Sequence, residues 1–430
     1  MSILKKSTDD VAITGMGIIS SIGQGISKFQ QALYEGKNNF STQFFSSLSH
    51  PVVGAFIDDY SSEKIFEVLL NLPKNTNKER NNHINKLKHH IPRHAELALI
   101  AVFEAWQQAG LNDKPIDGNL IALIVAAQNT MSHYQYEKHA EFLLQPDFLS
   151  PYYALHSLDT HYLGYLSDIF GIFGEGFTVG GASASGNIAL LRAYDLIRTG
   201  RQNICVVVGA AADLSPLELQ GFYNIGAMGG LHNINDPNKA CRPFDQASDG
   251  FIYGQASACL ILESISSATQ RDIPILGRIL GGCETLDGNY LSNSSVEGEI
   301  RTMQKALEIS KIDINEINYI NAHGSSSPSG DINEVKAIES LLGQRSQAVM
   351  LNSTKSIIGH CLWSAGIAEA IATIIQMNNK FVHPNLNLEH PIPNICKFIM
   401  GESKTYPINF ALSNSFGFGG INTSLVLASN

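Results

Sequence analysis

Short, continuous runs of apolar residues recur along the chain and predict buried strands. The runs at 120–126 and 203–210 are too short for a typical helix, and their residues do not alternate between apolar and polar. Such continuity is typical of strands that are covered on both faces. Similar strands are predicted at 11–20, 250–263, 319–322 and 349–352. The segments between them favour helices, so we expect an α/β protein with a largely parallel sheet.

The order of the predicted elements starts again after about Ser264. Helices are predicted at 96–110 in the first part of the chain and at 299–311, 331–342 and 365–378 in the second. A glycine-rich hairpin is predicted at 410–426. The amino-acid sequences of the two parts show no direct match, and no low-complexity linker divides them. We therefore expect two halves with similar element order, at residues 8–264 and 265–430.

Composition excludes several classes of protein. The chain has 430 residues, of which 44% are hydrophobic and 16% charged, as in a folded protein rather than a disordered one. A formal net charge of −10 argues against general binding of nucleic acid or of anionic membranes. The apolar runs are shorter than a membrane span, and the short polar beginning does not resemble a signal peptide.

The cysteine pattern favours reduced thiols. The chain has six cysteines and no CxxC pair, so neither a disulfide framework nor a cysteine-based metal site is expected. We therefore expect a cytoplasmic protein. The cysteines are Cys205, Cys241, Cys259, Cys283, Cys361 and Cys396.

A turn of small residues at 179–187 joins a predicted strand to a predicted helix. Ser183 lies in this turn, close to the positive end of the helix and its free N–H groups. This position suits a nucleophile with an oxyanion hole. A tight turn with a capping serine explains the same pattern, so the stretch by itself leaves both interpretations open.

Three further stretches carry candidate chemistry. His323 follows a predicted buried strand, where open α/β sheets bind ligands. Lys355 and His360 lie between an apolar strand and an apolar helix, and Lys355 there requires a carboxylate such as Asp331 or Glu334. The third stretch, Asn414 to Gly420, places two phenylalanines among glycines, which suits a flap or a packed turn.

The most polar stretch of the chain, residues 74–94, is rich in lysine, arginine and histidine. It is either a solvated surface or a basic docking site, with Lys86 and Lys88 as its candidate contacts. His89, His90 and His94 do not predict a metal site, because Pro92 interrupts them and no carboxylate or cysteine completes the set.

Taken together and in this order, the motifs resemble those of the β-ketoacyl-acyl-carrier-protein synthases, which have the thiolase-like fold. The resemblance runs from residues 12–17 to 417–420 and includes the mid-chain motifs Arg242–Asp245 and Asp249–Phe251. It implies a homodimer of five-layered αβαβα subunits, each made of two similar halves. It also implies an acyl carrier protein as partner. That protein carries the phosphopantetheine arm, so the enzyme needs no cofactor or metal of its own.

The resemblance also implies roles for single residues. His323 and His360 match the two catalytic histidines, and Lys355 with Glu334 matches a supporting ion pair. Ser325 and Ser327 stand where the family usually has threonines that bind the phosphopantetheine arm. Phe418 matches a gating aromatic residue, and Phe416 is expected to contact substrate beside it.

Ser183 departs from the family, which has a nucleophilic cysteine there. A free thiol has a pKa of about 8.5 that a helix N-terminus lowers, whereas a serine hydroxyl needs an adjacent base. Acyl transfer and condensation are thus in doubt, but decarboxylation needs only donors for an enolate oxygen. The chain resembles a subgroup with this Cys-to-Ser change, which converts malonyl-acyl carrier protein into acetyl-acyl carrier protein during polyketide β-branching.

Three other functions remain open at this level. Ser183 could still carry an acyl group in a condensing or acyl-transfer enzyme. The chain could instead be a non-catalytic partner subunit of a ketosynthase heterodimer, although the retained histidines argue against that. A hydrolase using Ser183, Asp331 and His360 has the right residue order, but Ser185 replaces a glycine that the G-x-S-x-G turn requires.

Overall fold

The N-terminal half forms one side of a long mixed sheet. The computed structural model describes the chain except for residues 1–9, 72–81, 83, 89–90 and 290–293. In this half the strands lie in the order β6-β5-β7-β9-β1. The first three run parallel, and β9 is antiparallel to both of its neighbours. These strands are β1 (Val11–Ser20), β5 (Ile121–Ala126), β6 (Gly176–Val179), β7 (Ile204–Gly209) and β9 (Ala256–Ser264).

The C-terminal half repeats this arrangement. Its strands lie in the order β14-β12-β11-β16-β17-β10, parallel from β14 to β16 and antiparallel from there to β10. Without the short β14, both halves have the spatial order third, second, fourth, fifth, first. The strands are β10 (Gly277–Leu286), β11 (Tyr319–Asn321), β12 (Met350–Asn352), β14 (Lys397–Phe398), β16 (Phe410–Gly417) and β17 (Ile421–Ala428). The prediction of two similar halves is therefore confirmed.

The prediction of a largely parallel sheet is wrong. Antiparallel pairs join β7 to β9, β9 to β1 and β10 to β17, and the two halves meet through the antiparallel pair β1–β10. The apolar runs indicated correctly that the strands are buried. They carried no information on direction, because helices cover both faces of the antiparallel strands as well.

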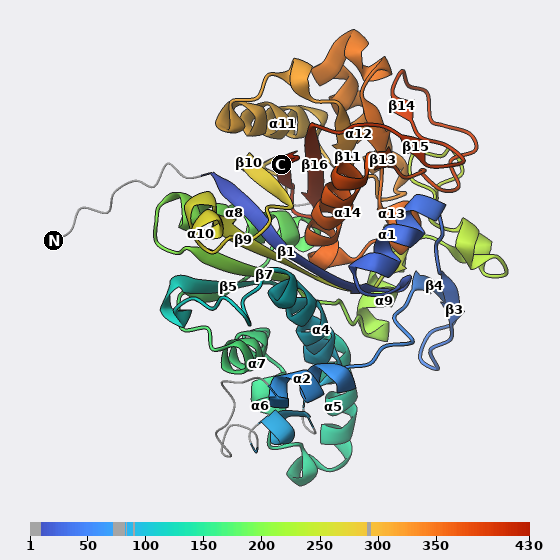
Figure 1. Ribbon diagram of the computed structural model, residues 1–430. Helices are drawn as coiled ribbons and strands as arrows, with labels where there is room; N and C mark the ends of the chain where they lie inside the picture. The colour runs from blue at the N-terminus through green and yellow to red at the C-terminus, as the bar shows by residue number, and fades with distance from the viewer. Residues whose placement is uncertain (1–9, 72–81, 83, 89–90, 290–293) are drawn as a thin grey trace.

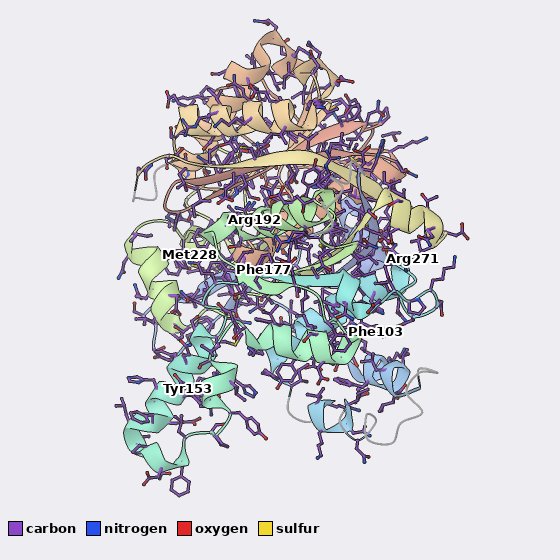
Figure 2. The ribbon with its side chains drawn as sticks, turned by 90° about the vertical axis from the view of Figure 1, so that its left-hand side faces the viewer. Phe103, Tyr153, Phe177, Arg192, Met228 and Arg271 are labelled. Atoms are coloured by element: carbon purple, nitrogen blue, oxygen red, sulfur yellow. The ribbon has the colours of Figure 1, made fainter. Side chains whose placement is uncertain are left out.

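Helices form three layers around the two halves of the sheet (Figure 1). The central layer holds α8 (Ser185–Arg198) and α14 (Ala365–Asn379), which contact each other and both halves. The outer layers hold α4 (Arg93–Gln108) with α7 (His161–Phe170), and α11 (Val296–Ser310) with α12 (Pro328–Leu342). In the turned view of Figure 2, Arg192 of α8 and Phe103 of α4 lie on opposite sides of the strand that carries Phe177. The layers give the expected αβαβα fold.

Two glycines allow the central helices to cross closely. A Cβ atom on Gly186 of α8 would lie 2.9 Å from the backbone nitrogen of Ile367, and one on Gly366 of α14 would lie 2.8 Å from that of Asn187. Contacts under 3 Å do not occur for real Cβ atoms, so glycine is required at both positions. This crossing fixes the beginnings of the two helices, where the candidate site lies.

The remaining elements lie around this frame. Among the described residues, no helix is long and apolar enough to cross a bilayer. The short strands are β2 (Gly23–Gln24), β3 (Ser41–Gln43), β4 (Val52–Ala55), β8 (Tyr253–Gly254), β13 (Phe381–Val382) and β15 (Lys404–Thr405). The other helices are α1 (Ile26–Glu35), α2 (Glu63–Asn71), α5 (Ser132–Leu144), α6 (Tyr153–His156), α9 (Pro216–Asn224), α10 (Ile265–Gln270) and α13 (Lys355–Ile358).

Candidate active site

Ser183 lies in a tight turn between β6 and α8, as the small residues predict. A 3₁₀ turn over Ala182–Ala184 leads into the helix, and Ala182 has a left-handed φ of 48°. Ser185 holds this turn together. Its hydroxyl accepts from the Gly181 N–H at 2.9 Å and donates to the Ala182 carbonyl at 2.7 Å. The side chain of Ser183 is half-buried and lines a pocket.

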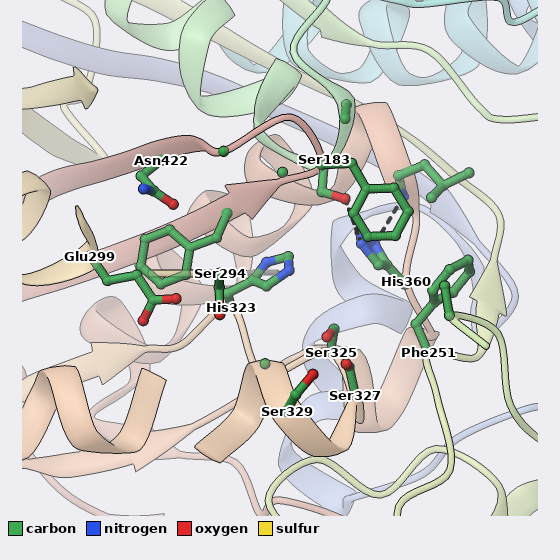
Figure 3. A pocket seen from close by; sticks show the side chains of 18 of the residues that line it. Ser183, Phe251, Ser294, Glu299, His323, Ser325, Ser327, Ser329, His360 and Asn422 are labelled. Atoms are coloured by element: carbon green, nitrogen blue, oxygen red, sulfur yellow. Dashed lines mark hydrogen bonds between the residues drawn. The ribbon is translucent and has the colours of Figure 1, made fainter. Parts of the chain in front are cut away.

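The two histidines follow adjacent parallel strands of the C-terminal half. His323 comes two residues after the end of β11, and His360 comes after β12 and the short helix α13. Their rings lie 5.5 Å apart between centroids and nearly perpendicular, at 80°. Both line the pocket that contains Ser183 (Figure 3). The fold therefore brings together the three residues that the sequence singled out.

The hydrogen bonds of His360 fix where its proton lies. The backbone N–H of Leu362 donates to His360 Nδ1 at 3.2 Å, so Nδ1 carries the lone pair and Nε2 carries the hydrogen. Nε2 lies 2.8 Å from Ser183 Oγ (Figure 3), and the Nε2–H donates to that oxygen. His360 is therefore a donor toward Ser183 and has no lone pair free to accept the serine proton.

His323 has the same donor orientation. Lys355 Nζ lies 3.4 Å from His323 Nδ1 and donates to it, which leaves the hydrogen on Nε2. Burial lowers the pKa of His323 well below its ordinary value, and the charge of Lys355 lowers it further. The same two causes, in the same order, lower the pKa of His360. Both imidazoles are thus neutral and present N–H groups at one wall of the pocket.

The predicted pairing of Lys355 with Glu334 is wrong. Lys355 forms a fully buried salt bridge with Glu369 of α14 and donates to the His323 carbonyl at 2.6 Å. Burial raises the pKa of Glu369, and Lys355 opposes that rise. Sequence reasoning missed Glu369. It is the sole charged residue of the apolar helix α14, and that isolation was the available signal.

Glu334 instead binds the backbone of the loop that follows β11 and carries His323. Its two carboxylate oxygens accept from the N–H groups of His323 and Gly324 at 2.8 and 2.7 Å. Asp331, the other candidate partner of Lys355, accepts from the Phe244 N–H at 2.7 Å. A hydrolase triad of Ser183, His360 and Asp331 is therefore wrong as well, because neither Asp331 nor any other carboxylate of the described residues orients His360.

The remaining predicted site residues line the same pocket. Ser325 and Ser327 lie at the start of α12, and Phe416 and Phe418 lie at the end of β16. The ring centroid of Phe416 is 5.8 Å from that of His323. Phe418 is 38% exposed, so it stands at the mouth of the pocket. Their position suits contact with a substrate arm, and that role remains a prediction.

Lys86 and Lys88 are exposed and do not line the pocket. Much of the polar stretch around them, residues 74–81, 83 and 89–90, lies outside the described residues, including His89 and His90. His94 is buried, and its Nε2 lies 2.9 Å from His161 Nε2. Within the described ranges, no group of three His, Cys, Asp or Glu side chains could hold a metal ion.

Comparisons with known proteins show which family has a similar sequence. The "Beta-ketoacyl synthase, N-terminal domain" family matches residues 8–268, and the "Beta-ketoacyl synthase, C-terminal domain" family matches residues 276–389. The chain is 36% identical to the polyketide biosynthesis malonyl-ACP decarboxylase PksF of Bacillus subtilis (strain 168), over 98% of this chain and 97% of that protein.

Two further relatives show the breadth of the family. The chain is 30% identical to 3-oxoacyl-[acyl-carrier-protein] synthase 2 of Staphylococcus aureus (strain N315), over 97% of each chain. The solved complex AntDE:AntF, a type II polyketide synthase acyl-carrier protein with its ketosynthase, matches with a TM-score of 0.81 and 26% identity. It covers 99% of this chain and 100% of the matched chain. This chain therefore belongs to the β-ketoacyl synthase family.

Proposed function

We propose that this protein decarboxylates malonyl-acyl carrier protein to acetyl-acyl carrier protein in polyketide biosynthesis. The observation that carries the proposal is the pair of neutral imidazole N–H donors, on His323 and His360, beside a serine that has no base. Loss of CO₂ from a malonyl thioester develops charge on the thioester oxygen. Two preorganised donors stabilise that charge, and each comparable donor is worth about 3–4 kcal/mol.

The same geometry disfavours acyl transfer through Ser183. A serine becomes a nucleophile when an adjacent base accepts its proton, and His360 presents an N–H to Ser183 instead. A non-catalytic partner subunit is disfavoured because both donors and the buried Lys355–Glu369 pair are retained. The similarity to PksF, a malonyl-ACP decarboxylase, supports the same conclusion.

The test is incubation of the purified protein with malonyl-loaded acyl carrier protein. We expect intact-mass measurement to show loss of CO₂ and an acetyl product, with no acyl ester on Ser183. Release of CO₂ at the background rate would contradict the proposal. An ester on Ser183 would support the condensing or acyl-transfer function instead. The electron sink is the thioester itself, so we propose that no cofactor beyond the phosphopantetheine arm takes part.

We propose that Lys86 and Lys88 contact the acyl carrier protein. Both are exposed lysines on the helical turn at 84–88, and carrier proteins of this family are acidic, so opposite charges would guide the encounter. Replacing both lysines with glutamate is expected to slow turnover of malonyl-acyl carrier protein more than turnover of a small malonyl pantetheine thioester. Equal effects on the two substrates would exclude docking at this site.

We also propose a homodimer. Strand β6 (Gly176–Val179) lies at the edge of the large sheet and is partly exposed. An exposed edge strand readily pairs with another strand, so a second copy could continue the sheet. Light scattering after size-exclusion chromatography tests this, and a mass of one chain at micromolar concentration would contradict it.

A further inference from the structure

A buried carboxyl group at the pocket has no role in the site described so far. Glu299 lies in the first turns of α11, is 1% exposed, and lines the pocket together with His323 and Ser183. Among the described residues, neither of its carboxyl oxygens makes a hydrogen bond of standard geometry. A buried carboxyl that lacks hydrogen bonds of standard geometry is unfavourable, so its presence in the wall of this pocket requires an explanation.

The groups that face Glu299 favour its neutral form. They are Glu334 and Asp331 on α12 and Asp287 at the end of β10. Burial raises the pKa of Glu299 well above its ordinary value, and the charge of Glu334 adds to the rise. The Ser294 hydroxyl acts in the opposite direction. Burial and the neighbouring carboxylates therefore both favour the protonated form of Glu299.

Glu299 differs from the other acid at this end of the pocket. Asp287 accepts from the Asn422 amide at 2.7 Å and lies 3.7 Å from the Arg301 guanidinium. Burial raises the pKa of Asp287, but these two neighbours favour its charged form. Figure 3 places Glu299 and Asn422 at one end of the pocket and Ser183 and His360 at the other, with His323 between them.

The proposed decarboxylation needs a proton donor. When the bond between Cα and the carboxylate breaks, its electron pair moves into the enolate and CO₂ leaves. The enolate becomes an acetyl group when a C–H bond forms at Cα. Neutral histidines are poor sources of this proton, because loss of an N–H would leave an imidazolate. A carboxylic acid becomes an ordinary carboxylate, which suits a general acid.

We propose that Glu299 supplies the proton that replaces CO₂ on the substrate. The O–H bond of Glu299 breaks, the C–H bond at Cα forms, and the Glu299 carboxylate recovers a proton from solvent before the next turnover. This inference rests on the proposed decarboxylase function. It assigns stabilisation of the oxyanion to the two histidines and delivery of the proton to a third residue, on helix α11.

The test compares Glu299→Gln with Glu297→Gln. Glu297 lies on the same helix and is exposed, so its variant controls for the loss of one carboxylate. Formation of acetyl-acyl carrier protein by Glu299→Gln is expected to slow by about 10²-fold, within the usual range for a general acid. Glu297→Gln is expected to match the wild type. Circular dichroism confirms that each variant is folded.

The pH profile separates proton donation from a structural role. The donor must be protonated, so the wild-type rate should fall as the pH rises through the raised pKa of Glu299. The Gln variant should lose that limb, and Glu299→Asp, which keeps an acid, should retain it at a reduced rate. A Gln variant with the wild-type rate, or a slow one with the wild-type profile, overturns the inference. If the Glu299→Gln variant does not fold, the Glu299→Asp variant provides the test: a rate that no longer falls with rising pH overturns the inference. An inactive wild type would instead overturn the decarboxylase function.

Discussion

Each half of the molecule leads its third strand into the central layer through the same kind of turn. Ala182 and Leu362 both have a left-handed φ, of 48° and 50°, and each begins a 3₁₀ turn. The helices α8 and α14 start directly afterwards. The next residue is Ser183 in one turn and Trp363 in the other. The fold therefore contains this turn twice. The two turns differ in their second residue, which is a serine with a reactive-site hydroxyl in one and an apolar tryptophan in the other.

The two turns line the same pocket but contribute different groups to it. Ser183 is half-buried and accepts from His360, whereas Trp363 is buried in an apolar cluster with Phe251 and Leu362. The C-terminal half also supplies both histidines and the Lys355–Glu369 pair. The N-terminal turn thus contributes one hydroxyl without a base. Variants in the C-terminal half should therefore have larger effects than variants at Ser183.

The largest expected effect is on folding, from breaking the buried ion pair. Lys355→Met leaves Glu369 as a buried charge without its partner, which should lower the free energy of unfolding by about 3–5 kcal/mol. Urea denaturation measures this change. The double variant Lys355→Met, Glu369→Leu should recover much of the loss. A single variant within about 1 kcal/mol of wild type would show that the pair is unimportant for stability.

The next effect is on catalysis. His323→Ala removes one of the two donors and should slow acetyl-acyl carrier protein formation by about 10²–10³-fold. His139→Ala is the matched control, because His139 is exposed on α5, and it should leave the rate unchanged. A rate for His323→Ala close to that of the wild type would remove His323 from the proposed site.

Stability should also fall at acid pH. The pKa of His323 and that of His360 are lowered in the folded state, so the unfolded chain binds more protons as the pH falls below about 6.5. Each histidine should then reduce the free energy of unfolding by up to about 1.4 kcal/mol per pH unit. Urea denaturation at pH 7.5 and 5.5 measures this, with a smaller pH dependence expected for His360→Ala. An equal dependence would mean that His360 is protonated in the folded protein.

The crossing of the two halves gives a smaller effect on stability. In Gly366→Ala the new Cβ would lie 2.5 Å from the side-chain oxygen of Asn187, and such overpacking typically costs about 1–3 kcal/mol. Gly164→Ala on α7 is the control, because a Cβ atom at that position would have no described neighbour within 4 Å. Thermal melts should separate the two variants. Equal melting temperatures would show that the helices can move apart freely.

The smallest effect is expected at Ser183. Ser183→Ala removes one neutral hydrogen bond, which is worth about 0.5–1.5 kcal/mol, so the decarboxylation rate should change by less than about tenfold. The assay on malonyl-acyl carrier protein measures it directly. A loss of a thousandfold would mean that Ser183 acts as a nucleophile and that the N-terminal turn contributes more to the reaction than one hydrogen bond.

The sequence by itself determined the elements and the list of chemical groups. Apolar runs located β5 and β7, and helical patterns located α4, α11, α12 and α14. Such elements can be predicted because the pattern of apolar residues within a short segment indicates a buried strand or a helix. The motifs around Ser183, His323 and His360, taken in order with those at 12–17, 242–251 and 417–420, were sufficient to indicate the family. They also showed that the usual nucleophile is missing.

The tertiary structure alone decided strand direction, side-chain pairing and proton positions. Lys355 pairs with Glu369 rather than Glu334 because the fold places Glu369 of α14 beside the first residue of α13, and no pattern of neighbouring residues indicates that contact. The donor orientation of His360 depends on the Leu362 N–H, and the raised pKa of Glu299 depends on burial and on the charge of Glu334. These properties arise from groups that are distant in the chain and close in space, so they appear only when the chain is folded.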